Sequence, residues 1–363
     1  MLTDSRSSPA RVLQILLSLL LWSTLAGCGV AYLAQATQGQ WRLMRARRPI
    51  DRVLADPATT PQLKSRLELV QDARDFASSA LALPDNRSYR SYTDLKRPYV
   101  VWNVVAAPEF SIEPRHWCFP FTGCLSYRGY FRESNARDFA AGLAARGDDT
   151  LVAGVAAYST LGHFADPVLN TMMRYGDLEM IAMIFHELAH QLIYVKGDTQ
   201  FNESFAVTVE QEGLRRWLEV RGRGPELTDF LARREADRQF TRALADGRAA
   251  LDALYHQPLS PDEMRARKRE LLSATADHVR ALEQQLKRRS GYDAWIDVGL
   301  NNAHLASIAT YSDCVPGFQR LLERNAGELP AFYAAVRKLK RDRSARRALC
   351  RQPAATATAA PTP

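Results

Sequence analysis

Apolar positions along most of the chain recur every three or four residues, the spacing that places them on one face of an α-helix. This pattern predicts helices over residues 32–82, 177–195, 201–220, 226–255, 261–289 and 293–310. Shorter segments rich in β-branched, aromatic or small apolar residues predict strands at residues 99–105, 124–131 and 151–160. The sequence therefore predicts an α+β fold that is mainly helical and carries a small sheet.

The helices expected within residues 226–289 alternate acidic and basic residues, a pattern typical of a solvated helical hairpin rather than of a nucleic-acid-binding arm. Residues 260–263 carry a capping box, with Pro261 at the first helical position. The whole chain has 48 Lys+Arg against 40 Asp+Glu, and this net charge of +8 is too diffuse to indicate nucleic acid as a partner. We expect the hairpin to be an insertion in one domain at residues 28–352, followed by a disordered Ala/Thr/Pro tail at residues 353–363.

The N-terminus has the pattern of a targeting segment. Two arginines precede the apolar run at residues 12–26, which is shorter than the about 20 residues that span a bilayer and is typical of a secretory signal peptide. The run ends in Leu-Ala-Gly-Cys28, which resembles the lipobox of bacterial lipoproteins. That resemblance implies removal of residues 1–27 and acylation of the Cys28 thiol. Gly29 is similar to the residue that follows the cysteine in lipoproteins sorted to the outer membrane.

The cysteine count agrees with export. Without Cys28, four of the five cysteines remain, namely Cys118, Cys124, Cys314 and Cys350, and an even number in an oxidising compartment indicates disulfides. Cys118 and Cys124 bracket a short loop, so they are candidates for a short-range bridge that would leave Cys314 and Cys350 as the second pair. Their spacing does not match zinc knuckles, and the three possible pairings stay open at this point.

The most specific chemical signal is the sequence His-Glu-Leu-Ala-His at residues 186–190. His186 and His190 are four residues apart, so both imidazoles lie on one helical face and can reach one Zn²⁺ ion. Glu187 is positioned to accept a proton from an attacking water, the general-base role in zinc peptidases. The alternative is a hydrogen-bonded polar network in the core, but two histidines and a glutamate on an apolar helix are costly to bury without a ligand.

A catalytic zinc site needs a third protein ligand beside an open position. Glu203, in Asn-Glu-Ser-Phe-Ala at residues 202–206, is the candidate, because Gly197 and Asp198 form a turn that lets the following helix pack back on the first. A third histidine at the spacing of the metzincin peptidases is absent, so a three-histidine site is disfavoured.

The two motifs together resemble those of the gluzincin metallopeptidases, in which HExxH is followed by a segment that carries a ligand glutamate. Nearly the whole mature chain also resembles a bacterial lipoprotein family described as zinc aminopeptidases. The matching stretches are residues 32–50, 117–131, 157–162, 186–190, 202–213 and 301–311. The resemblance implies a zincin-like fold with a small sheet beside the HExxH helix. It implies His186, His190 and Glu203 as ligands of one zinc ion per chain, with Glu187 as catalytic base and acid.

Several further positions are weaker candidates. Glu210 lies two helical turns beyond Glu203 and is either a hydrogen-bond acceptor for a ligand histidine or a surface carboxylate. Tyr311 is our candidate for stabilising the tetrahedral oxyanion, with a core tyrosine as the alternative and His304 as a second candidate. Residues 157–162 form either an edge strand that pairs with extended substrate or an ordinary core strand. Tyr127 lies in an aromatic loop that could line the cleft.

We therefore predict zinc-dependent hydrolysis of peptide bonds, by an aminopeptidase that is lipid-anchored at the periplasmic face of a bacterial envelope membrane, the outer membrane by its resemblance. One alternative is an endopeptidase of the same chemistry, since no acidic residue in the sequence is identifiable as the anchor of a substrate α-amine. The other is a lipoprotein that binds an envelope partner without catalysis. Glu187→Gln separates catalysis from binding, because it removes the proton acceptor and leaves the metal ligands.

Overall fold

The computed structural model describes residues 32–119, 123–157, 160, 162, 164–308 and 314–351. The expected signal peptide, Cys28, Tyr311 and the C-terminal tail lie outside the described residues, as do three positions of the segment 157–162. None of the helices in the described part of the chain is long and apolar enough to cross a membrane.

The described chain is mainly helical. Its helices span residues 32–45, α2 (Ile50–Ala55), α3 (Pro61–Ser79), α4 (Glu133–Ala144), α5 (Asp177–Leu192), α6 (Thr199–Val220), α7 (Gly224–Tyr255), α8 (Pro261–Leu286), α9 (Asp293–Val298), α10 (Asn302–Ser307), α11 (Val315–Arg324), α12 (Leu329–Leu339) and α13 (Arg343–Arg351), with a 3-10 turn η1 at Asn170–Arg174. Its strands are β1 (Arg48–Pro49), β2 (Ser91–Thr93), β3 (Val101–Pro108), β4 (Trp117–Phe119), β5 (Gly123–Leu125), β6 (Arg128–Tyr130), β7 (Asp148–Val155) and β8 (Val168–Leu169). These elements agree with an α+β fold.

The longest strands form an antiparallel sheet in the order β6-β3-β7, with β7 at one edge of the described strands. Side chains of β3 alternate between its two faces. Trp102 and Val104 pack on alanines of α4, whereas Val105 packs with Leu151 of β7 and Ala303 of α10. A helix therefore covers each face of the sheet. Two smaller sheets, β1-β2-β8 and β4-β5, lie apart from it.

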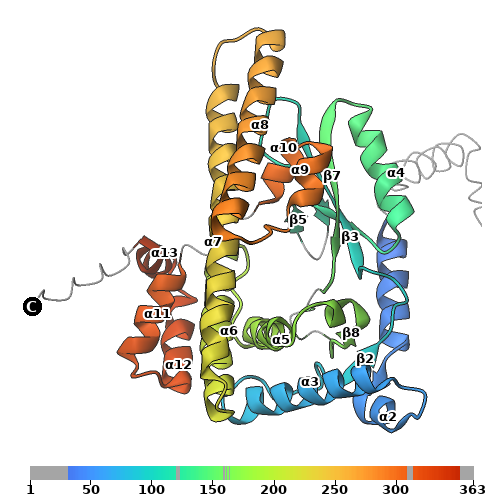
Figure 1. The fold of residues 1–363 in the computed structure, drawn as a ribbon, viewed down its shortest axis with the longest axis vertical. Helices are drawn as coiled ribbons and strands as arrows, with labels where there is room; N and C mark the ends of the chain where they lie inside the picture. Colours follow the sequence, from blue (N-terminus) through green and yellow to red (C-terminus); the bar gives the residue numbers. More distant parts are fainter. Residues whose placement is uncertain are drawn as a thin grey trace, which may run out of the picture.

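The main core surrounds α5, whose residues Ile181, Ile184 and Phe185 are fully buried. Helices α3, α6, α11 and α12 contribute to the same core, and α5 lies among them in Figure 1. Helices α5 and α6 approach closely at Gly213, where an added Cβ would lie 2.9 Å from the Phe185 ring. A glycine at this position lets the two helices that carry the chemical motifs pack tightly together.

Helices α7 and α8 form the expected hairpin, which extends beyond the rest of the molecule in Figure 1. The capping box at Ser260 is present, with Glu263 as its reciprocal partner. The hairpin is held to the sheet by charge pairs, since Lys268 donates to Asp149 at the start of β7 over 2.6 Å. Our expectation that the hairpin is an insertion in a single domain stays a prediction.

Several predicted boundaries were wrong for local reasons. The strand expected at residues 124–131 is two strands, β5 and β6, separated by a bend. The helix expected at residues 293–310 is divided into α9 and α10 at Gly299, whose φ of 92° no right-handed helix can contain. The last predicted strand ends at Val155, so the described residues of the segment 157–162, namely 157, 160 and 162, lie outside β7.

Two disulfides are present, Cys118–Cys124 across the β4-β5 hairpin and Cys314–Cys350 between α11 and α13. Of the three pairings that the sequence left open, this is the one that joins the two cysteines closest in sequence.

Candidate metal centre

Three side chains from α5 and α6 converge on one point. The Nε2 atoms of His186 and His190 lie 3.1 Å apart, and His186 Nε2 lies 3.2 Å from Glu203 Oε2. His190 Nε2 lies 3.5 Å from Glu203 Oε1. Two atoms that are each about 2.0–2.1 Å from a tetrahedral Zn²⁺ ion lie about 3.3 Å from each other. The spacing of the three donors therefore fits one face of a tetrahedral site.

The segment between the two helices fixes Glu203. The buried side chain of Asn202 accepts from the Val195 N–H and donates to the Val195 carbonyl, each over 2.8 Å. Asp198 caps α6 by accepting from the Phe201 N–H, and Arg346 of α13 donates to the other oxygen of Asp198 over 2.7 Å. These contacts define where α6 begins. Glu203 is the residue directly after Asn202, whose two hydrogen bonds to the Val195 backbone we call the Asn202 clamp.

Glu210 lies behind His186 and is only 4% exposed. Its Oε2 is 3.0 Å from His186 Nδ1, and its Oε1 accepts from Arg234 of α7 over 2.7 Å. A carboxylate at Nδ1 fixes the tautomer in which Nε2 faces the metal position. The structure therefore brings Glu210 to His186, the contact that one of our two sequence interpretations required.

Electrostatics reinforce this donor set. Burial alone would lower the pKa of His186, but hydrogen bonds to Glu203 and Glu210 and the charges of Glu210 and Glu187 outweigh it and raise the pKa to about 10. Burial would raise the pKa of Glu203, whereas its hydrogen bonds from both histidines lower it to about 2. Glu203 therefore stays ionised between the two imidazoles, as a carboxylate ligand of a divalent cation must.

Half-buried Glu187 follows His186 on α5 and is near enough for its charge to affect the His186 pKa. It lies beside the donor set without being part of the group of three that could hold a metal ion. Its place in the sequence and on the helix is compatible with the proton-acceptor role that we predicted for it.

The sequence analysis did not single out Tyr194. This tyrosine is 38% exposed, and its ring lies edge-on to His190 with 6.2 Å between centroids. Tyr127 is 40% exposed, and the surrounding protein and Tyr194 raise the pKa of its phenol. The influence of Tyr194 on the Tyr127 phenol places the two tyrosines near each other. The only signal in the sequence was that Tyr194 follows His190 by four residues, just beyond the end of α5.

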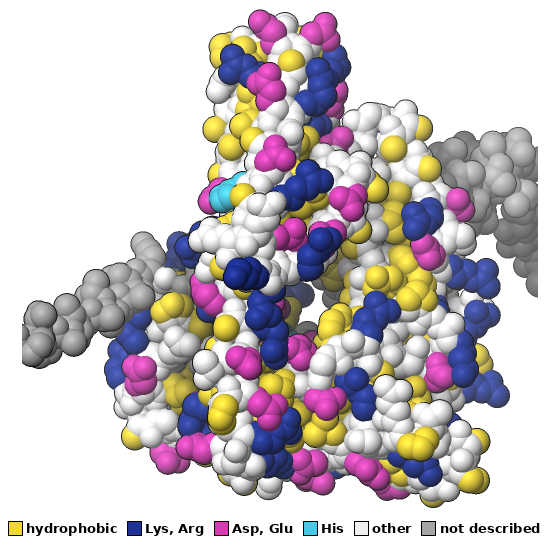
Figure 2. All heavy atoms as spheres, in the orientation of Figure 1, with side chains coloured by type: hydrophobic (Ala, Val, Ile, Leu, Met, Phe, Trp, Pro, Cys, Tyr) yellow, Lys and Arg dark blue, Asp and Glu magenta, His cyan; other side chains and the backbone are white. Residues whose placement is uncertain are grey.

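His304 has a structural role, and the candidate segment 157–162 is described in part. His304 is 4% exposed and lies at the N-terminus of α10, where its Nδ1 accepts from the Asn301 N–H over 3.2 Å. Thr160 donates through its backbone and its hydroxyl to Asp166, and an added Cβ at Gly162 would lie 3.5 Å from Gln191, the residue after His190. Gly162 therefore lies near the end of α5. Figure 2 shows the face hollowed near its centre, just above the level of α5 in Figure 1.

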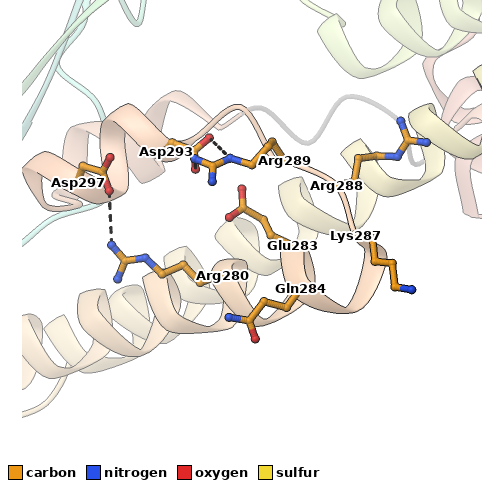
Figure 3. Close-up of a pocket in the computed structure, with 8 residues that line it drawn as sticks. All are labelled: Arg280, Glu283, Gln284, Lys287, Arg288, Arg289, Asp293 and Asp297. Atoms are coloured by element: carbon orange, nitrogen blue, oxygen red, sulfur yellow. Dashed lines mark hydrogen bonds and ion pairs between the residues drawn. The ribbon is translucent and has the colours of Figure 1, made fainter.

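A second charged cavity, of about 450 Å³, lies between α8 and α9. Figure 3 shows that its charges pair with one another, Arg280 with Asp297 and Arg289 with Asp293. Glu283 accepts from the Ser290 N–H over 2.7 Å. These contacts join the C-terminal end of α8 to α9 and use the charges of the cavity lining, so we assign no ligand to the cavity.

The fold and the site define a mainly helical protein with a His-His-Glu group able to hold a metal ion. The chain belongs to the protein family described as "putative aminopeptidase", whose sequence model matches residues 31–350. Comparisons with curated proteins and with solved structures give no match. Family membership over nearly the whole described chain supports a peptidase.

Proposed function

We propose that this protein is a zinc-dependent aminopeptidase with a zincin-like fold and one zinc ion per chain. The observation that carries the proposal is the convergence of His186, His190 and Glu203, whose donor atoms lie within 4.8 Å of one another. Two imidazoles and one carboxylate are the donor set of catalytic zinc sites that keep an open position. Family membership supports peptide as the substrate.

The chain's own residues would divide the reaction as follows. His186, His190 and Glu203 hold the ion, and Glu210 holds the His186 ring in the tautomer that leaves Nε2 free to bind. When bound there, zinc supplies Lewis acidity toward a peptide carbonyl and lowers the pKa of water. Glu187 accepts the proton of the attacking water and delivers it to the amine that leaves.

We also propose that the protein works outside the cytoplasm. The apolar run at residues 12–26 supports a signal peptide, and Cys28 is the residue that the lipobox resemblance assigns to lipidation, at the periplasmic face of the outer membrane. The disulfides Cys118–Cys124 and Cys314–Cys350 agree with an oxidising compartment.

The test measures metal content and hydrolysis on the same preparations. We expect one zinc per chain in the wild type and in Glu187→Gln, and loss of that zinc in Glu203→Ala. Hydrolysis of peptides with a free N-terminus should fall by a factor of about 10²–10⁴ in Glu187→Gln, the usual contribution of a general base. Glu219→Gln, an exposed carboxylate on the same helix as Glu203, is the matched control.

Three results would argue against the proposal. Absence of stoichiometric metal would favour a lipoprotein that binds an envelope partner. Wild type and Glu187→Gln with equal activity on every peptide would exclude the assigned chemistry. Cleavage of N-acetylated peptides as fast as free ones would show an endopeptidase at the same site.

A further inference from the structure

The helix of residues 32–45 has one face inside the molecule and one outside. Tyr32 stacks on Phe119 and meets Tyr130 edge-on, and Leu43 is 4% exposed. On the opposite side Leu33 is 41% exposed and Trp41 is 56% exposed. We call the surface formed by Leu33, Ala34, Thr37, Gln38 and Trp41 the outer face of this helix. The helix lies on the far side of the molecule from α11–α13 in Figure 1.

The chain around this outer face is cationic. Residues 32–50 contain Arg42, Arg45, Arg47 and Arg48 and no acidic residue. Arg45 lies over the ring of Trp41, with its guanidinium carbon 5.0 Å from the centroid. Arg47 donates to backbone carbonyls and Arg48 pairs with Asp56. Within the described residues, neither Arg42 nor Arg45 forms an ion pair.

A cavity of about 440 Å³ adjoins the outer face and shares Gln38 with it. Its cationic lining comes from Arg42, Arg97 and Arg132, and its acidic lining is Asp94, which pairs with Lys96 over 2.7 Å. Arg97 donates to the Val100 carbonyl over 2.6 Å, which holds this guanidinium at the wall of the cavity. The cavity therefore has room and positive charge for an anionic group beside an apolar surface.

We propose that the outer face docks on an anionic phospholipid bilayer, with Leu33 and Trp41 at the boundary of headgroups and acyl chains. The phosphate of one headgroup would occupy the cavity lined by Arg42 and Arg132. An exposed tryptophan beside arginines is the composition that stabilises a helix lying in a membrane interface.

The sequence before the helix favours a bilayer over an acidic protein partner. The apolar run ends at residue 26, and the seven residues to Leu33 reach at most about 25 Å. Wherever that run or an acyl group on Cys28 enters a membrane, the outer face is thus held within reach of the headgroups. Juxtamembrane arginines are then each attracted by the anionic surface.

The experiment uses the full chain bound to vesicles, so that the membrane anchor is the same in every sample. The difference in fluorescence between wild type and Trp41→Phe isolates Trp41 from the other five of the six tryptophans. In vesicles that contain phosphatidylglycerol and brominated acyl chains, we expect this difference to be quenched more than twofold. Iodide in the water should quench it little.

Charge variants test the headgroup cavity. Arg42→Ala with Arg132→Ala should lessen the bromine quenching at least twofold, whereas Arg267→Ala with Arg269→Ala, exposed positions on α8, should leave it unchanged. Quenching of Trp41 by iodide but not by bromine would show that the outer face stays in water. That result would overturn the proposal and favour a soluble partner for this face. Equal bromine quenching in purely zwitterionic vesicles would overturn the headgroup assignment. None of these readouts depends on hydrolysis.

Discussion

The carboxylate of Glu210 accepts from two helices at once, from His186 of α5 through Oε2 and from Arg234 of α7 through Oε1. Glu210→Gln keeps the size of the side chain but removes the charge that fixes the His186 tautomer. We expect this variant to bind zinc about 10- to 100-fold more weakly, the usual cost of removing such a partner. Competition with a chelator of known affinity measures the zinc affinity of the variant, and Glu219→Gln on the same helix is the control. Unchanged affinity would leave Glu210 as a buried ion-pair partner of Arg234 alone.

At the scale of single residues the sequence predicted the convergence of His186, His190 and Glu203, because this arrangement depends on local spacing. His186 and His190 are fixed by one helical turn, and Glu203 by the turn at Gly197 and Asp198. Tyr194 could not be selected in the same way, because only its ring contact with His190 distinguishes it from other tyrosines.

At the scale of elements, long helices were predictable and short strands were not. Helices α5 to α8 carry their own periodic signal, whereas β1, β2 and β8 have two or three residues and exist through partners far away in the sequence. The two hydrogen bonds between the Asn202 side chain and the Val195 backbone could not be predicted either. An asparagine in an apolar helix is locally unfavourable, and only the folded structure shows its partner.

Asn202→Ala should test that clamp. The variant leaves the buried N–H and C=O of Val195 without their partner, which costs about 1–3 kcal/mol for each group that water cannot reach. We expect a lower free energy of unfolding in urea without metal, together with weaker zinc binding because Glu203 follows directly. Gln257→Ala, in the exposed loop between α7 and α8, controls for the loss of an amide. A stable variant with weak zinc binding would mean that the clamp orients α6 without stabilising the fold.

The N-terminus of α10 gives a pH-dependent prediction. Burial lowers the pKa of His304 to about 4, so the ring is neutral in the folded protein over most of the pH range. Between the ordinary histidine pKa of about 6.5 and 4, the unfolded chain binds a proton that the folded chain does not. Stability therefore falls as the pH decreases through this window, by up to about 3 kcal/mol. His304→Gln keeps an acceptor at the cap and cannot titrate, so its unfolding free energy should lack this component. Parallel pH profiles for the two proteins would contradict the assignment.

At the scale of the whole molecule, the three C-terminal helices support the ligand helix from behind. Phe318 of α11 packs on Phe201 and Phe205 of α6, on either side of Glu203, with ring centroids 5.0 and 5.9 Å apart. The Cys314–Cys350 disulfide joins positions 36 residues apart, and Cys118–Cys124 joins positions 6 apart.

Because a longer loop loses more freedom when it is closed, chain entropy assigns about 4 kcal/mol to the first bridge and about 2 kcal/mol to the second. Replacing Cys314 and Cys350 by serine should therefore lower the unfolding free energy more than the same change at Cys118 and Cys124. Only the replacement of Cys314 and Cys350 should also weaken zinc binding, because α11 packs on α6, whereas the β4-β5 hairpin carries none of the three proposed ligands. Urea unfolding and chelator competition on both double variants measure the two effects. Equal losses of stability with zinc affinity unchanged in both would mean that α6 keeps its position without the C-terminal helices, and that the α5–α6 contact alone assembles the metal site.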